Sequence, residues 1–173
     1  GNFNITQGAV FGLQPVTYSG VSFATSLTDE ISVTAGVVND VYSDTMVSSD
    51  NNKAYFGQVS YQGDAFGLNV GGIIGDSDDT FCAFAAGPQN DCQVSIVDVV
   101  LTADPTDNIS VWANFDWVNV NGSDNVDGNL FGAAAAGRVG LTDTIGFATR
   151  LEYINTSNQL TGLADDSELF TVT

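Results

Sequence analysis

The sequence contains no histidine and only three basic residues, Lys53, Arg138 and Arg150, against 21 acidic ones. Without histidine a Ser-His-Asp catalytic triad is excluded, and we predict that the protein is not an enzyme. Three cations cannot neutralise a run of phosphates, so we expect no nucleic-acid partner. The same scarcity excludes a polybasic patch that would hold the protein on a membrane surface.

No segment is apolar over the roughly 20 residues that a transmembrane helix requires. A transmembrane strand needs only about 9 to 11 residues and escapes this exclusion. Leucine is sparse and methionine occurs once, whereas there are 19 glycines and 11 phenylalanines. This composition suits pleated sheet and is poor for helices, so the predicted fold class is all-β.

Only two cysteines occur, Cys82 and Cys92, and both lie in one loop. In an oxidising compartment this spacing closes a small loop, so we predict a disulfide bond, with two free thiols as the alternative. Two thiolates without histidine do not complete a zinc shell, so we expect no metal and no cofactor.

Stretches of about ten residues alternate apolar with small or polar side chains, and short turns alternate with long acidic loops between them. The predicted strands are Ser19–Leu27, Ile31–Asn39, Lys53–Tyr61, Phe66–Gly75, Gln93–Ala103, Ile109–Val118, Asn129–Leu141, Ile145–Ile154 and a ninth from Glu168. The short turns Leu27-Thr28-Asp29, Leu101-Thr102-Ala103-Asp104 and Leu141-Thr142-Asp143 resemble one another, as in a meander of repeated hairpins.

The two faces of the predicted strands differ in character. Phe115 and Trp117 fall on an apolar face, while Asn114 and Asp116 fall on the other. Most strand charges share the second face with glycine and alanine, although the solvent face of a soluble sheet normally carries many charges. The pattern favours a barrel with an apolar outside and a watery lumen. The alternative is a soluble extracellular all-β binding or adhesion module.

Aromatic residues lie near predicted strand ends on the apolar face, as expected at the two membrane interfaces. They are Tyr18, Tyr55, Tyr61, Phe66, Trp117, Phe131 and Tyr153.

Acidic residues gather in the long loops, for example in Asp76–Asp79 and Asp124–Asp127. We interpret these segments as solvated loops of a protein from a salty or marine setting, with a calcium site as the alternative.

Four sequence stretches carry a family resemblance. They are Gln14–Val21, which begins Gln-Pro-Val-Thr, Leu27–Asp40, Val97–Ile109 and Arg150-Leu151-Glu152-Tyr153. They resemble the β-barrel porin family of Gram-negative bacteria that is related to the OmpL-like porins. In that family a Gln-Pro-Phe-Thr-like segment precedes a strand pair, and an Arg-x-Glu-Tyr motif marks a later strand. Here Glu30 and Asn108 replace the lysine usual in such turns.

The resemblance implies an antiparallel up-and-down meander that forms all or part of a transmembrane β-barrel in the bacterial outer membrane. It implies a porin for passive diffusion of small hydrophilic solutes or ions, with the lipid bilayer and lipopolysaccharide as its surroundings and a homo-oligomer as a further possibility. Family members are longer, and such barrels generally finish on an aromatic residue. We therefore expect residues 1–173 to be a single β-barrel region of a longer porin, with 1–17 as a preceding loop or strand end and 18–173 as hairpin repeats.

Six residues are predicted to line the pore: Asp98, Asn114, Asp116, Arg138, Arg150 and Glu152. Because the strands that carry Arg138 and Arg150 are hairpin partners, we expect the two guanidinium groups at related heights on the inner wall. Two interpretations stay open for this charged set. It forms either a salt-bridge network that fills the lumen or a constriction that filters solutes.

Overall fold

A computed structural model describes residues 7–15, 17–42, 53–77, 92–122, 128–142, 144–156 and 167–173 of the chain. Within them lie one short 3-10 helix and nine strands. Their bounds are η1 Val10–Leu13, β1 Gly20–Ser26, β2 Ile31–Val38, β3 Ala54–Gln62, β4 Phe66–Ser77, β5 Cys92–Thr106, β6 Ile109–Gly122, β7 Gly128–Gly140, β8 Gly146–Thr156 and β9 Ser167–Val172. The predicted all-β class is confirmed.

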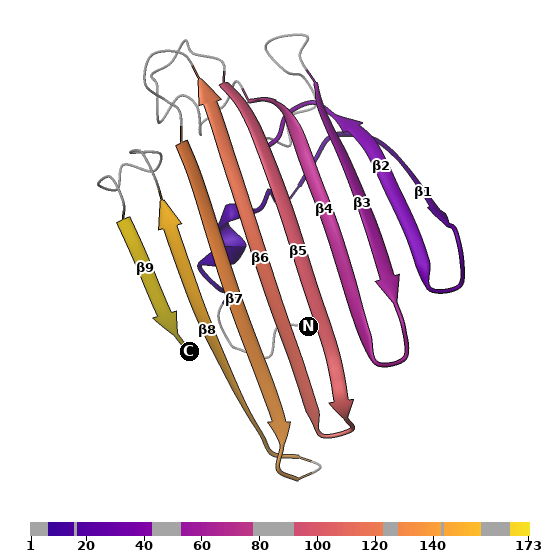
Figure 1. The fold of residues 1–173 in the computed structure, drawn as a ribbon, viewed down its shortest axis with the longest axis vertical. Coiled ribbons are helices and arrows are strands. Elements are labelled where there is room, and N and C mark those ends of the chain that lie inside the picture. Colours follow the sequence, from indigo (N-terminus) through magenta and orange to yellow (C-terminus); the bar gives the residue numbers. More distant parts are fainter. Residues whose placement is uncertain are drawn as a thin grey trace.

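The nine strands form one antiparallel sheet in which each strand pairs with its neighbour in sequence, from β1 to β9. The short turns all lie at one end of the sheet, the lower end in Figure 1. The sheet is not closed, because β1 and β9 each pair with a single strand of the described part. The meander and the segregation of short turns are therefore as predicted.

Several strands are longer than predicted, mainly toward the long-loop end of the sheet. The segment 119–122 belongs to β6 and pairs with β5, so the predicted loop begins later than expected. The turn predicted at Asp104–Asn108 is shorter than expected, since β5 continues to Thr106 and β6 begins at Ile109. A register shift between Ala103 and Thr106 accommodates Pro105, which has no amide hydrogen to give to a ladder. Leu101 and Thr102 therefore lie inside a strand.

The predicted turns that begin Leu27-Thr28 and Leu141-Thr142 share one hydrogen-bond arrangement. The Thr28 hydroxyl accepts hydrogen bonds from the amides of Glu30 and Ile31, at 3.2 and 3.0 Å. The Thr142 hydroxyl accepts from the amides of Thr144 and Ile145, at 3.3 and 3.0 Å. In each case one threonine satisfies two amides of a tight hairpin, which is the physical reason for the repeated Leu-Thr pair.

The distribution of polarity across the sheet is opposite to that of a soluble protein. Phe115 is 43% exposed and Phe147 is 64% exposed on the outer face. On the inner face Asp116 is 0% exposed and Arg150 4% exposed. Large apolar side chains on the outside and buried ionic groups on the inside are what a membrane barrel requires.

Two aromatic pairs lie on the outer face at opposite ends of the strands. Tyr61 and Phe66 have ring centroids 5.1 Å apart beside a short turn, and Phe131 and Tyr153 are 5.8 Å apart toward the long-loop end. They agree with the predicted interfacial aromatics. Tyr18 does not, because it stacks at 6.1 Å on Phe56 of the inner face.

No helix in the described part of the chain is both long enough and apolar enough to cross a membrane. The one helix, η1, lies against β6, β7 and β8.

A small hydrophobic core fills the inner face toward the long-loop end. It contains Val38, Ala54, Ile73, Val94, Ile96, Val118, Val120, Leu130 and Ile154 from the strands, with Val10 and Val41 packed on them. The lumen lining predicted from the sequence was glycine and alanine together with the charged residues and Asn114. This lining was incomplete, because valine and isoleucine also face inward here, and Val10 and Leu13 of η1 pack against this cluster.

Candidate functional site

The segment from Gln7 to Pro15 lies across the inner face of the sheet and contacts Asp98 of β5, Asp116 of β6 and Glu152 of β8. In a 3-10 helix side chains three residues apart lie on one side, so Val10 and Leu13 face the sheet together. Gly132 of β7 makes room for them. A Cβ atom at this position would lie 2.7 Å from Leu13 Cδ1 and 3.2 Å from both Val10 methyl groups.

Glu152 of β8 anchors the start of η1. Its carboxylate accepts hydrogen bonds from the Ala9 amide at 3.1 Å and the Val10 amide at 3.2 Å. The Thr171 hydroxyl of β9 donates to the same carboxylate at 2.9 Å, and Arg150 Nε lies 3.3 Å from it. Both oxygens of Glu152 are thus engaged, and the ion pair with Arg150 is almost fully buried.

Gln14 anchors the other end of the segment. Its Nε2 donates two hydrogen bonds of 2.9 Å, one to Asp98 Oδ1 of β5 and one to Asp116 Oδ1 of β6. Asp98 and Asp116 are directly opposite each other in the register of the two strands. Asn114 Nδ2 adds a 2.7 Å hydrogen bond to Asp98 Oδ1. One neutral amide therefore bridges two acidic side chains.

Tyr42 supplies a third anchor from beyond the end of β2. Its hydroxyl donates a 3.0 Å hydrogen bond to the Leu13 carbonyl oxygen. Burial, with smaller contributions from Tyr18 and Asp116, raises the pKa of the Tyr42 hydroxyl far above its ordinary value. The hydroxyl therefore stays protonated and remains a donor over the physiological pH range.

Five of the six predicted pore-lining residues come together beneath this segment: Asp98, Asn114, Asp116, Arg150 and Glu152. Arg138 does not join them. Arg150 lies opposite Ala136, whereas Arg138 lies opposite Ala148, one inward position nearer the short turns. Arg138 is also exposed and lies beside Gly146. The two arginines therefore occupy neighbouring inward positions along the wall.

The segment itself was missed by sequence reasoning, which placed residues 1–17 before the barrel. The spacing of Val10 and Leu13 and the glycine at position 132, just before the four alanines of β7, are the sequence signals of this contact. Neither indicates which strand the segment meets, because the contact joins residues more than 100 positions apart.

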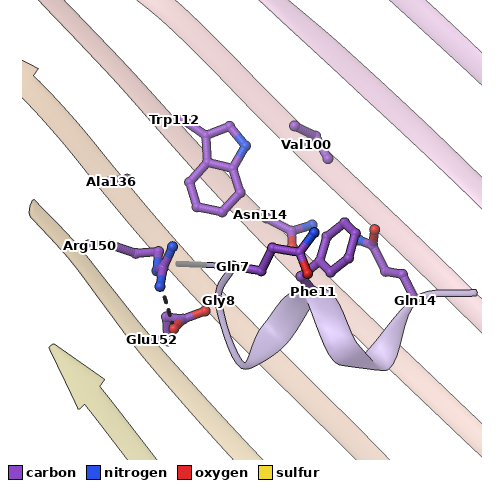
Figure 2. Close-up of a pocket in the computed structure, with 10 residues that line it drawn as sticks. All are labelled: Gln7, Gly8, Phe11, Gln14, Val100, Trp112, Asn114, Ala136, Arg150 and Glu152. Atoms are coloured by element: carbon purple, nitrogen blue, oxygen red, sulfur yellow. Dashed lines mark ion pairs between the residues drawn. The ribbon is translucent and has the colours of Figure 1, made fainter. Parts of the chain in front are cut away.

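A cavity of about 330 Å³ remains between the segment and the sheet (Figure 2). Gln7, Gly8, Phe11 and Gln14 line it from the segment. Its other walls come from the strands, with Val100 on β5, Trp112 and Asn114 on β6, Ala136 on β7, and Arg150 and Glu152 on β8.

A second cavity of about 260 Å³ lies on the β3 to β5 side and is lined by Tyr18, Gln58 and Asp98 among others. Gln14 borders both cavities. The Gln14 side chain thus lies between the two open spaces on the inner face.

Two predictions concern residues that the structure does not describe. Cys92 is buried at the start of β5, but Cys82 lies outside the described residues, so the disulfide stays a prediction. Most of the acidic loop residues, including Asp124–Asp127, also lie outside them. Among the residues described, no group of three or more acidic, cysteine or histidine side chains is arranged to hold a metal ion.

The model of a protein family described as "Putative beta-barrel porin-2, OmpL-like" matches residues 1–173, which is the whole chain. No significant match was found among curated proteins or among solved structures. The open nine-strand meander, its apolar outer face and its charged inner face agree with a barrel of that kind. The chain therefore belongs to this family of OmpL-like β-barrel porins.

Proposed function

We propose that the protein lets small hydrophilic solutes and ions diffuse passively across the bacterial outer membrane through a lumen narrowed by the segment that carries η1. The observation that carries this proposal is the polarity of the sheet. An outer face with Phe115 and Phe147 exposed suits hydrocarbon, and an inner face with Asp116 and Arg150 suits a polar channel.

The segment from Gln7 to Pro15 acts as the constriction. It is held at both ends by hydrogen bonds to inward carboxylates, from Ala9 and Val10 to Glu152 and from Gln14 to Asp98 and Asp116. The cavities on either side of Gln14 are the space left for solutes. Of the two interpretations of the charged residues, this arrangement favours the filter, because the charges hold the narrowing element.

In the membrane the two edges of the sheet must be paired, since an unsatisfied strand edge in hydrocarbon is costly. We propose that β1 and β9 pair with further strands or with a second copy, so that lipid and lipopolysaccharide contact only the closed outer wall. A homo-oligomer is one way to achieve this closure.

The test is reconstitution of the full-length protein in planar bilayers, with KCl conductance as the measurement. We expect discrete channel openings, recovery of the protein in the outer-membrane fraction, and a gel mobility that changes on boiling because a closed hydrogen-bonded barrel resists detergent. A monodisperse monomer that needs no detergent and gives no conductance would instead support the soluble all-β binding module.

A further inference from the structure

The larger cavity has a lining that differs from that of a simple water-filled passage. It lies between the segment of η1 and strands β5 to β8, and its volume of about 330 Å³ is enough for one small solute. Binding sites for small molecules are concave, largely apolar, and carry a few well-placed polar groups. The cavity has all three properties.

Two aromatic rings border the cavity from opposite sides. Trp112 comes from β6 and Phe11 from η1, and Phe11 is 42% exposed on the inner side of the sheet. Trp117, at an odd position of the same strand, belongs to the outer face, so Trp112 is not part of an interfacial girdle. The negative face of an aromatic ring attracts the C–H groups on one side of a saturated ring.

The polar groups at the cavity are mostly neutral amides. Gln7, Gln14 and Asn114 each carry both a donor and an acceptor. Gln7 makes no side-chain hydrogen bond to another residue of the described part, and neither does the Trp112 indole N–H. These groups are available to hydroxyl groups of a bound solute.

The charges at the cavity compensate each other. Arg150 lies 3.3 Å from Glu152, and Glu152 also accepts hydrogen bonds from Ala9, Val10 and Thr171. Because this carboxylate is already saturated, the cavity has no strong preference for an ion of either sign. The small side chain of Ala136 leaves the space between Trp112 and Arg150 open.

We propose that this cavity is a binding subsite for an uncharged sugar of monosaccharide size, whose ring lies against Trp112 and whose hydroxyl groups bind Gln7, Gln14 and Asn114. The proposal names a solute class for the proposed porin function. It rests on that function only in that the sugar reaches the cavity through the lumen. It makes the pore a channel with a saturable site for one class of solute.

Binding is tested first without transport. Of the two tryptophans within residues 1–173, Trp117→Phe removes the one on the outer face and leaves Trp112 at the cavity. Glucose titrated into the full-length variant in detergent should change the tryptophan emission along a saturating curve. L-alanine, a zwitterion without a ring, should cause no saturable change.

Transport is tested in planar bilayers, where glucose should reduce the KCl conductance with a similar half-saturating concentration. Trp112→Ala should raise that concentration at least tenfold. Phe115→Ala on the outer face of the same strand is the matched control and should change it less than twofold. If glucose changed the Trp112 emission along a saturating curve but the protein gave no conductance, the subsite would be supported and the porin function refuted. If glucose reduced the KCl conductance along no saturating curve, or if L-alanine gave such a curve and glucose did not, the subsite would be refuted. The porin function would stand.

Discussion

Gln14 and Asp116 lie 102 positions apart in the chain, yet a hydrogen bond of 2.9 Å joins Gln14 Nε2 to Asp116 Oδ1. The same amide nitrogen also donates to Asp98. A neutral donor at this position allows two carboxyl groups to lie side by side under the constriction. Changing its charge is therefore the most direct way to release the segment from the wall.

Gln14→Glu should detach the segment, because a third carboxylate would face Asp98 and Asp116 and a buried acceptor would lose its donor at a cost of about 1–3 kcal/mol. We expect faster proteinase K cleavage within residues 7–15 and a higher single-channel conductance. Gln62→Glu, exposed beside a short turn, is the control and should change neither. An unchanged cleavage rate in Gln14→Glu would show that the amide does not hold the segment.

Gly132→Ala should also displace η1, for a steric reason. The added methyl would lie 2.7 Å from Leu13 Cδ1, which is closer than real Cβ contacts. Gly137→Ala on the same strand is the matched control, since its nearest neighbour would be the Ser110 carbonyl oxygen at 3.9 Å. A nitroxide spin label at position 11 should become more mobile in the first variant alone. Equal mobility in both variants would contradict the packing of η1 on β7.

Tyr42→Phe should weaken the docking of the segment by about 1 kcal/mol, because the Leu13 carbonyl oxygen loses its donor. Since burial raises the pKa of Tyr42, the hydroxyl contributes fully below its ordinary pKa of 10.0 and the contribution is lost only as the pH rises above that value. Proteinase K cleavage of the parent should therefore accelerate at strongly alkaline pH, where the variant has no such bond to lose. Tyr55→Phe, exposed on the outer face, should behave as the parent.

The channel should be weakly cation-selective, because Asp98, Asp116 and Glu152 outnumber Arg138 and Arg150 on the inner wall. Arg138 is exposed and lies one inward position nearer the short turns than Arg150, so Arg138→Ala should shift the reversal potential in a KCl gradient further toward cations. Arg138→Lys keeps the charge and should leave it unchanged. Addition of Arg150→Ala should enlarge the shift and also loosen the segment, because Glu152 loses its ion-pair partner.

Anion selectivity of the parent would mean that the arginines, not the acids, govern the constriction. The comparison is best made near 0.1 M salt, where the Debye length of about 10 Å mutes the acidic loops more than the confined wall charges.

The predicted bond between Cys82 and Cys92 should be found by mass spectrometry of the non-reduced protein as the absence of alkylatable thiols. Closure of this loop of about ten residues would contribute roughly 2–3 kcal/mol in the chain-entropy model. Cys82→Ser should leave the conductance unchanged and lower the resistance of the loop to proteolysis. Two thiols that react with an alkylating reagent before reduction would refute the bond.

The hairpin order and the two faces of the sheet were predictable because both depend on neighbours in sequence. Alternation of residue type is enough to place Phe115 outside and Asp116 inside, and the repeated threonine is enough to mark two of the tight turns. The strand ends were less predictable, because 119–122 differs little in composition from a loop.

The constriction was not predictable for the opposite reason. Nothing in the local pattern of residues 7–15 says that this stretch will meet β6 to β8, because its partners are single side chains on distant strands. The heights of Arg138 and Arg150 along the wall depend on the register of β7 on β8. A register change of two residues would keep both side chains inward but move one past the other. Tyr18 was misplaced because its position lies before the first strand, where alternation gives no guidance.

The hydrogen bonds of Ala9 and Val10 to Glu152 span 143 and 142 positions of the chain. Such non-local contacts form slowly, because a long loop must be closed before any of them stabilises the structure. The segment of η1 can therefore settle only after β8 is in place, late in maturation. The sheet would then form first, with its hairpins paired and its lumen still wide. Docking of the segment, which narrows the lumen, would be the last step of folding.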